Sequence, residues 1–202
     1  MLIDMTRTVT AKMPVFPGDS PIMLKQSVGK EDNIVHFHIT MGMHVGTHMD
    51  GPLHMIPKGK KISDIAVDKF VANGHVIDAR GSREIGAELL ENHIISLGDC
   101  VLIYTGFDEK FGEQSYYTEY PCMTESFARK LVELKIKFVG MDTPSPDRAP
   151  YLVHRILLQE EILIIEGLTN LSKLLDVKWF EITALPAKFE AEASPARVIA
   201  KI

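Results

Sequence analysis

HVGTHMDGPLH, residues 44 to 54, places three histidines and one carboxylate within eleven residues. The four side chains belong to His44, His48, Asp50 and His54, and because all four positions are even-numbered, an extended chain would direct them to one face. A regular strand would still hold His44 and His48 about 13 Å apart, too far for both to reach one metal ion through bonds of about 2 Å. We therefore predict that the chain bends at Gly46, with a second break at Gly51-Pro52.

A helix is the alternative conformation for this segment, because it would also bring His44 and His48 onto one face. Gly46 and Gly51-Pro52 oppose a helix, and no glutamate lies beside the first histidine. The preceding residues favour a strand, since apolar side chains occupy the odd positions from 35 to 43 while the even positions are polar or glycine. We predict a half-buried strand whose polar face continues into the histidine series.

The chemistry of these side chains predicts a metal site. Imidazole nitrogen and carboxylate oxygen, without a thiolate, suit zinc, manganese or iron. His36 and His38 share the polar face of the predicted strand. We interpret both as solvent-exposed or as groups lying behind the ligands, because a polar strand face is usually hydrated.

The composition is that of one globular domain. With 202 residues, 46% hydrophobic and 24% charged, the chain can bury one sizeable core, and we predict a single domain over residues 1–202. The net charge is −5, and the largest basic run is the short segment Lys58-Gly59-Lys60-Lys61. Nucleic acid is therefore not an expected partner.

Two features bear on the compartment. Cys100 and Cys122 are too few for a disulfide framework and form no CxxC pair, which fits a reducing environment. The first residues include Asp4 and Arg7 and lack the apolar run of a signal peptide, and no run approaches the roughly 18 apolar residues that cross a membrane. We expect a cytoplasmic protein that does not contact membranes.

Periodicity and turn residues predict the other elements. Strand-like segments lie at residues 1–10, 67–70, 74–78, 100–104, 136–141, 162–165, 182–185 and 196–202, and helices are predicted over 83–96, over 124–134 with Thr124 as the cap, and from Pro150 onward. Residues 107–121 are predicted to form a loop. This order predicts a mixed α/β domain.

Three residues outside the histidine segment are further candidates. Glu166 follows the apolar run 162–165, and a carboxylate there is costly to bury unless it is paired or bound to a cation. His154 falls in the last predicted helix, and the sequence leaves open whether it is a ligand or a surface residue. Phe16 lies on a loop stiffened by prolines at 14, 17 and 21, where an aromatic ring is either a substrate wall or local packing.

The motif HVGTHMDGPLH resembles the HxGTHxDxPxH signature of the cyclase-like metal-dependent hydrolases, a family that includes bacterial kynurenine formamidases and isatin hydrolases. The resemblance covers nearly the whole chain. It also includes the FPGDSP loop, the TGF segment at 105–107, the MDTPSPD loop, His154 with Glu166 twelve residues later, and SPARVIA near the end. It implies a swivelling β/β/α cyclase-like fold with a mixed sheet.

The same resemblance implies roles for particular residues. The metal ligands would be His44, His48, Asp50, His154 and Glu166, with Asp50 bridging two ions in binuclear members. His54 would be the catalytic histidine rather than a ligand. One or two divalent ions are implied per subunit, zinc first and manganese as the alternative. The family also implies a homo-oligomer, either dimer or tetramer.

The implied activity is hydrolysis of a small-molecule amide. The first expectation is an arylformamidase that converts N-formylkynurenine to kynurenine and formate in tryptophan catabolism. Phe16 stands where formamidases often carry Trp, so an aromatic wall is retained. A hydrolase of a cyclic amide or lactone is the nearer alternative, and a metal-binding protein without catalytic activity is the other.

Overall fold

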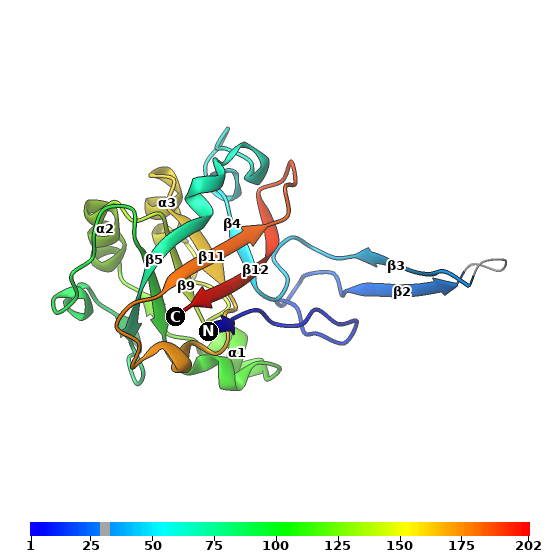
Figure 1. The fold of residues 1–202 in the computed structure, drawn as a ribbon, viewed down its shortest axis with the longest axis horizontal. Helices are drawn as coiled ribbons and strands as arrows, with labels where there is room; N and C mark the ends of the chain where they lie inside the picture. Colours follow the sequence, from blue (N-terminus) through cyan, green and yellow to red (C-terminus); the bar gives the residue numbers. More distant parts are fainter. Residues whose placement is uncertain (29–32) are drawn as a thin grey trace.

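The computed structural model describes residues 1–28 and 33–202. Its main strands are β1 (Leu2–Asp4), β4 (His48–Asp50), β5 (Val71–Asp78), β7 (Cys100–Tyr104), β9 (Phe138–Met141), β10 (Leu163–Glu166), β11 (Glu181–Pro186) and β12 (Ala193–Lys201). They form one sheet in the order β1-β12-β11-β5-β7-β9-β10-β4, and β12 also pairs with β4. This second pairing closes the sheet into the barrel-like core seen in Figure 1.

Both parallel and antiparallel pairs occur in this sheet, which confirms the predicted mixed α/β fold. β5, β7, β9 and β10 run parallel, whereas β4, β11 and β12 pair antiparallel to their neighbours. β7 is buried along its whole length, as its continuous apolar sequence predicts for a strand covered on both faces. Its residues alternate between two cores, with Leu102 on one side and Val101 and Ile103 on the other.

The two longest helices cover one side of the sheet. α2 (Glu125–Leu134) and α3 (Leu152–Gln159) contact each other and bury Phe127, Leu131 and Leu157 in the core that also contains Val101. The hydroxyl oxygen of Thr124 accepts a hydrogen bond from the backbone amide of Phe127, so the predicted helix cap is confirmed. The short α1 (Gln114–Thr118) lies in the segment predicted to be a loop.

Three of the predicted strands and helices are wrong. Only Leu2–Asp4 of residues 1–10 is a strand, because the chain then leaves the sheet and the amide of Arg7 donates to the hydroxyl of Thr47. Residues 67–70 form a 3-10 helix. The helix predicted over 83–96 is replaced by β6 (Glu84–Ile85), which pairs with β8 (Cys122–Met123), and a 3-10 helix at Ala87–Leu90.

β2 (Met23–Val28) and β3 (Val35–Thr40) form a separate antiparallel ribbon that projects from the barrel (Figure 1). We call this ribbon the arm. The predicted strand at 35–43 is therefore present from Val35 to Thr40, but every residue of β3 is exposed within one chain. The prediction that this strand is half-buried is wrong for the single chain, and His36 and His38 are exposed.

The topology brings the histidine segment and the end of β10 together. In the antiparallel pair of β4 with β10, His48 lies directly opposite Glu166 and Asp50 lies opposite Ile164. Directly opposed residues share a face of the sheet, so His48 and Glu166 are side-chain neighbours although they are far apart in sequence. Among the helices of residues 1–28 and 33–202, none is long and apolar enough to cross a membrane.

Candidate metal centre

The bend predicted between His44 and His48 is present at Gly46, whose φ is +63°. L-residues with a side chain rarely adopt this left-handed conformation, and an added Cβ would lie 3.0 Å from the Met13 side chain. The Nδ1 atom of His48 donates a hydrogen bond to the Gly46 carbonyl oxygen at 3.0 Å. The turn therefore brings the two imidazole centroids to 5.1 Å and leaves Nε2 of His48 directed at Glu166.

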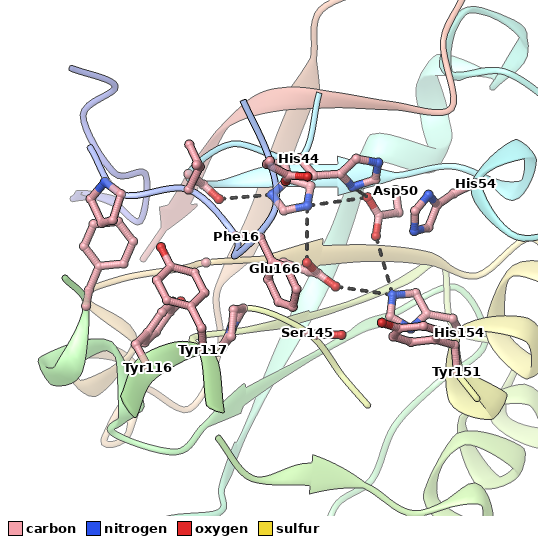
Figure 2. Close-up of a pocket in the computed structure, with 18 of the residues that line it drawn as sticks. Phe16, His44, Asp50, His54, Tyr116, Tyr117, Ser145, Tyr151, His154 and Glu166 are labelled. Carbon is pink, nitrogen blue, oxygen red and sulfur yellow. Dashed lines mark hydrogen bonds and ion pairs between the residues drawn. The ribbon is translucent and has the colours of Figure 1, made fainter. Parts of the chain in front are cut away.

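Asp50 lies at the centre of the cluster (Figure 2). One carboxylate oxygen, Oδ1, lies 2.9 Å from Nδ1 of His44 and 3.6 Å from Nε2 of His48. The other, Oδ2, lies 3.8 Å from Nε2 of His154. Glu166 lies between His48 and His154, at 3.2 Å and 3.4 Å from their Nε2 atoms. All five residues expected to be ligands are thus in one cluster.

The carboxylates of this cluster are held in their ionised form. Burial alone would raise the pKa of Asp50, but the hydrogen bond from His44 and the charge of His48 hold that pKa well below its usual range. Burial and the charge of Asp50 raise the pKa of Glu166, yet contacts with His154 and His48 leave it below its ordinary value. Two ionised carboxylates therefore lie side by side in the interior.

The imidazoles respond to that negative charge. Burial lowers the pKa of His48, but Glu166 and Asp50 outweigh it and raise the pKa to about 9. Burial likewise opposes protonation of His154, whereas Asp147 and Glu166 raise its pKa to about 10. Without a cation, the site takes up protons to balance its carboxylates. A bound divalent cation would supply the same positive charge.

The donor atoms fit a divalent metal ion. Four buried side-chain atoms make no hydrogen bond of regular geometry with the described residues, although each lies 2.9 to 3.8 Å from an oppositely charged neighbour; these are Nε2 of His48, Oδ1 and Oδ2 of Asp50, and Oε1 of Glu166. Buried polar atoms are nearly always hydrogen-bonded, so four such atoms in one cluster favour a bound ligand that they would share. Nitrogen and oxygen donors from His44, His48 and Asp50 lie within 4.8 Å of one another, and donors of these types suit zinc or manganese.

His54 borders the cluster from the 3-10 helix Pro52–His54. Its ring centroid lies 4.3 Å from that of His44 and 5.7 Å from that of His154. Burial leaves the pKa of His54 below its ordinary value. In His44, His48 and His154 the neighbouring carboxylates outweigh burial and raise the pKa. A nitrogen of His54 also lies within 4.8 Å of donor atoms of Asp50 and His154, so its position suits either a ligand or a proton carrier.

Asp147 is a site residue that the sequence analysis did not single out. Its buried carboxylate accepts a hydrogen bond of 2.5 Å from Nδ1 of His154 and another of 2.7 Å from the amide of Val153. The first bond orients the ring so that Nε2 faces Asp50 and Glu166, and with a metal bound it would hold the proton on Nδ1 and leave Nε2 as the ligand atom. The sequence contained one signal for this residue. Asp147 ends the MDTPSPD loop and precedes His154 by seven residues.

A cavity of about 280 Å³ opens above the cluster and is walled by aromatic rings. Phe16, Phe111, Tyr116, Tyr117 and Tyr151 line it, as Figure 2 shows for four of them. The Phe16 and Tyr117 rings meet edge to face at 5.8 Å, and the guanidinium of Arg7 lies 3.8 Å from the Phe111 ring centroid. The volume and the apolar walls suit a small aromatic molecule. Phe16 is thus at the cavity, as a substrate wall would be.

The closed mixed sheet and the buried cluster beneath an aromatic cavity define a class of small-molecule hydrolase. The family model described as Putative cyclase matches residues 3–148, and the chain belongs to this cyclase family of metal-dependent hydrolases.

Individual relatives agree with this assignment. A kynurenine formamidase of Bacillus cereus is 30% identical over 203 residues, covering 98% of this chain and 95% of that protein. The structure of a predicted metal-dependent hydrolase from Bacillus stearothermophilus is 27% identical with a TM-score of 0.82, covering 99% of this chain and 97% of the other. Isatin hydrolase A from Labrenzia aggregata, bound to benzyl benzoate, has a TM-score of 0.87 at 24% identity, covers 99% and 93%, and supports the fold alone.

Proposed function

We propose that this chain is a divalent-metal-dependent amide hydrolase that converts an aryl formamide, N-formylkynurenine first, to the aromatic amine and formate. The observation that carries the proposal is the pair of buried, ionised carboxylates of Asp50 and Glu166, surrounded by imidazoles at the base of an aromatic cavity. The 30% identity to a kynurenine formamidase over nearly the whole chain supports the substrate class.

The residues that would hold the metal are His44, His48, Asp50, His154 and Glu166. Zinc is the first candidate and manganese the second, with one or two ions per subunit. When bound, a divalent ion lowers the pKa of a coordinated water and polarises a carbonyl group, which together favour attack on an amide. Asp50 would serve as the shared ligand if two ions bind, because its two oxygens face different histidines.

His54 is proposed to carry the proton of the reaction. It would take a proton from the attacking water and deliver it to the leaving aniline nitrogen, a role that suits an imidazole with an ordinary pKa of about 6.5. Its ring lies beside His44 and His154 and lines the cavity where the substrate would bind. The five proposed ligands would be bound to the metal and could not carry this proton, which leaves His54 for the step.

The aromatic walls are proposed to orient the substrate. Phe16 and Tyr117 form one edge-to-face pair at the cavity, and a substrate ring that packs against them would present its formyl group to the cluster. The buried position of His48, Asp50 and Glu166 limits bulk water near the reacting carbonyl. We also propose that the protein acts as a homo-oligomer in the cytoplasm.

A substrate panel tests the proposal. Metal-loaded protein is given N-formylkynurenine, the cyclic amide isatin and an aryl lactone, and both products of each reaction are quantified. The proposal predicts equal release of formate and aromatic amine from the first substrate, with the highest kcat/KM of the three. Faster opening of isatin or the lactone would replace the formamidase by a cyclic-amide or lactone hydrolase. Metal binding without turnover of any substrate would leave only a metal-binding protein.

A further inference from the structure

Arg7 lies three residues after the end of β1 and bonds to the turn behind the cluster. Its backbone amide donates to the hydroxyl oxygen of Thr47 at 3.0 Å, and that hydroxyl donates to the carbonyl oxygen of Gly167 at 2.7 Å. The Nε atom of Arg7 donates to the same carbonyl oxygen at 3.2 Å. The backbone and the side chain of Arg7 therefore both hold the residue that follows Glu166.

Gly167 is tightly packed at this position. Its φ is +66°, and an added Cβ would lie 2.6 Å from the carbonyl oxygen of Gly46. That carbonyl oxygen accepts the hydrogen bond from Nδ1 of His48 at 3.0 Å. Gly167 thus packs on the turn that orients His48, and the bonds from Arg7 and Thr47 fix the end of β10 behind the carboxylate of Glu166.

The guanidinium of Arg7 also contacts the wall of the cavity. Its central carbon lies 3.8 Å from the ring centroid of Phe111 and 5.8 Å from that of Tyr116, and both rings line the cavity (Figure 2 shows Tyr116). The two rings meet edge to face, with their centroids 5.3 Å apart. A cation over the face of an aromatic ring is attracted to it electrostatically. The group that bonds to Gly167 therefore also holds Phe111.

We propose that Arg7 is a positioning residue that fixes the Phe111 wall relative to the carboxylate of Glu166. This inference rests on the proposed function, in which the ring of the substrate packs in the aromatic cavity while its formyl group meets the cluster. A wall fixed relative to Glu166 presents one binding surface to that ring. A loose wall has to be ordered again each time a substrate binds, which weakens binding.

The acceptors of Arg7 explain why an arginine suits this position. All three side-chain acceptors are backbone carbonyl oxygens, which belong to Gly167 at 3.2 Å, Asp108 at 3.4 Å and Leu168 at 3.5 Å. A planar guanidinium can stack on a ring and donate from its edge at the same time, whereas a lysine ammonium is a compact point charge. Arg7→Lys therefore keeps the charge and removes the double contact.

A fluorine resonance tests the placement of the wall without metal or substrate. 4-Fluorophenylalanine is incorporated at position 111 in wild type, Arg7→Lys and Arg80→Lys. Arg80 is the matched control, because its guanidinium carbon lies 5.4 Å from the Tyr104 ring centroid and neither residue lines the cavity. The resonance should be single and narrow in wild type and Arg80→Lys, and split or broadened in Arg7→Lys. A resonance of the same width in all three proteins would overturn the proposal.

Steady-state kinetics test what this placement does for the substrate. Zinc-loaded Arg7→Lys should show a KM for N-formylkynurenine that is raised about tenfold, with kcat within about threefold of wild type, because the lost contact contributes to binding of the ring. Bound zinc per chain should match wild type, since Thr47 still bonds to Gly167. Arg80→Lys should match wild type in both constants.

Two kinetic outcomes would overturn the proposal. A lower kcat at unchanged KM is what a smaller amount of folded protein would produce, and loss of zinc would mean that Arg7 supports the cluster and not the wall. Failure of the proposed function is a separate result, in which wild type itself releases no formate. The fluorine resonance decides the placement of Phe111 in that case as well, because it uses neither metal nor substrate.

Discussion

The carboxylate of Asp147 and the imidazole of His154 are joined by a buried hydrogen bond of 2.5 Å between Oδ1 and Nδ1. The second carboxylate oxygen accepts the amide of Val153 at 2.7 Å, so the carboxylate is fixed to the start of α3. His154 is consequently held in one orientation, with Nε2 3.4 Å from Glu166 and 3.8 Å from Asp50. A proposed ligand is thus oriented before any ion binds.

Asp147→Asn should weaken zinc or manganese binding by about 10- to 100-fold, as is typical when the hydrogen-bond partner of a ligating histidine is removed. Competition with a chelating dye measures this affinity. Asp99→Asn is the matched control, because Asp99 is also buried and pairs with a histidine, His75, at 2.8 Å outside the cavity lining. Equal metal affinity in wild type and Asp147→Asn would show that the hydrogen bond does not position His154.

His54→Ala should lose about 10² to 10⁴ in kcat while retaining metal, because a general acid-base group contributes on that scale. His48→Ala should lose both metal and turnover, because Nε2 of His48 faces Asp50 and Glu166. Metal content by elemental analysis is measured on the same samples as kcat. Loss of metal from His54→Ala would make His54 a ligand instead of the proton carrier.

Metal binding should stabilise the fold. A free ion concentration 100 times its Kd adds about 2.7 kcal/mol to the free energy of unfolding, or roughly 5 to 10 °C in Tm for a chain of this size. Asp50→Asn should abolish this increase, since Asp50 lies centrally among the histidines. Calorimetry with and without added zinc makes the comparison. An equal rise in Tm for Asp50→Asn would place the binding site elsewhere.

Asp142 should make stability depend on pH. Burial raises the pKa of its carboxyl to about 6, although Thr105 and Gly106 donate hydrogen bonds to it. The folded state then holds a proton between about pH 4 and pH 6 that the unfolded chain has released, so this contribution is full below pH 4 and is lost as the pH rises through 6.

The free energy of unfolding of wild type minus that of Asp142→Asn should therefore fall by on the order of 3 kcal/mol between pH 4 and pH 7. Urea denaturation of both proteins at four pH values in this range gives the difference, and effects of other groups cancel. A difference independent of pH would mean that the Asp142 carboxyl titrates alike in the folded and unfolded chain.

Features fixed by local residue pattern were predictable from the sequence. The apolar run at 100–104 is β7 with the predicted bounds, and the runs at 136–141 and 162–165 are β9 and β10 with bounds shifted by one or two residues. Thr124 capped α2, and the chain bent at Gly46 as the spacing of His44 and His48 required. In each case the signal that predicts the feature, an apolar run, a capping residue or a glycine turn, lies within a few residues of sequence.

Features that depend on distant partners were not predictable. The spacing of the glutamates at 84, 88 and 91 is that of the solvent-exposed face of a helix. Instead, Glu84–Ile85 pairs with Cys122–Met123 as a short strand, and the segment buries Ile85 and Leu90. The alternation over 35–43 predicts a half-buried strand, but all residues of Val35–Thr40 are exposed because the arm projects from the barrel (Figure 1). The pairing of Asp147 with His154 likewise depends on how α3 packs after the loop.

The measurement that bears most directly on the central claim is turnover against bound metal. Protein stripped with a chelator is given increasing zinc or manganese, and metal content and release of formate from N-formylkynurenine are recorded on the same samples. We predict that the rate rises in proportion to bound metal, and that Asp50→Asn neither binds metal nor releases formate. Full turnover by metal-free protein would contradict the account.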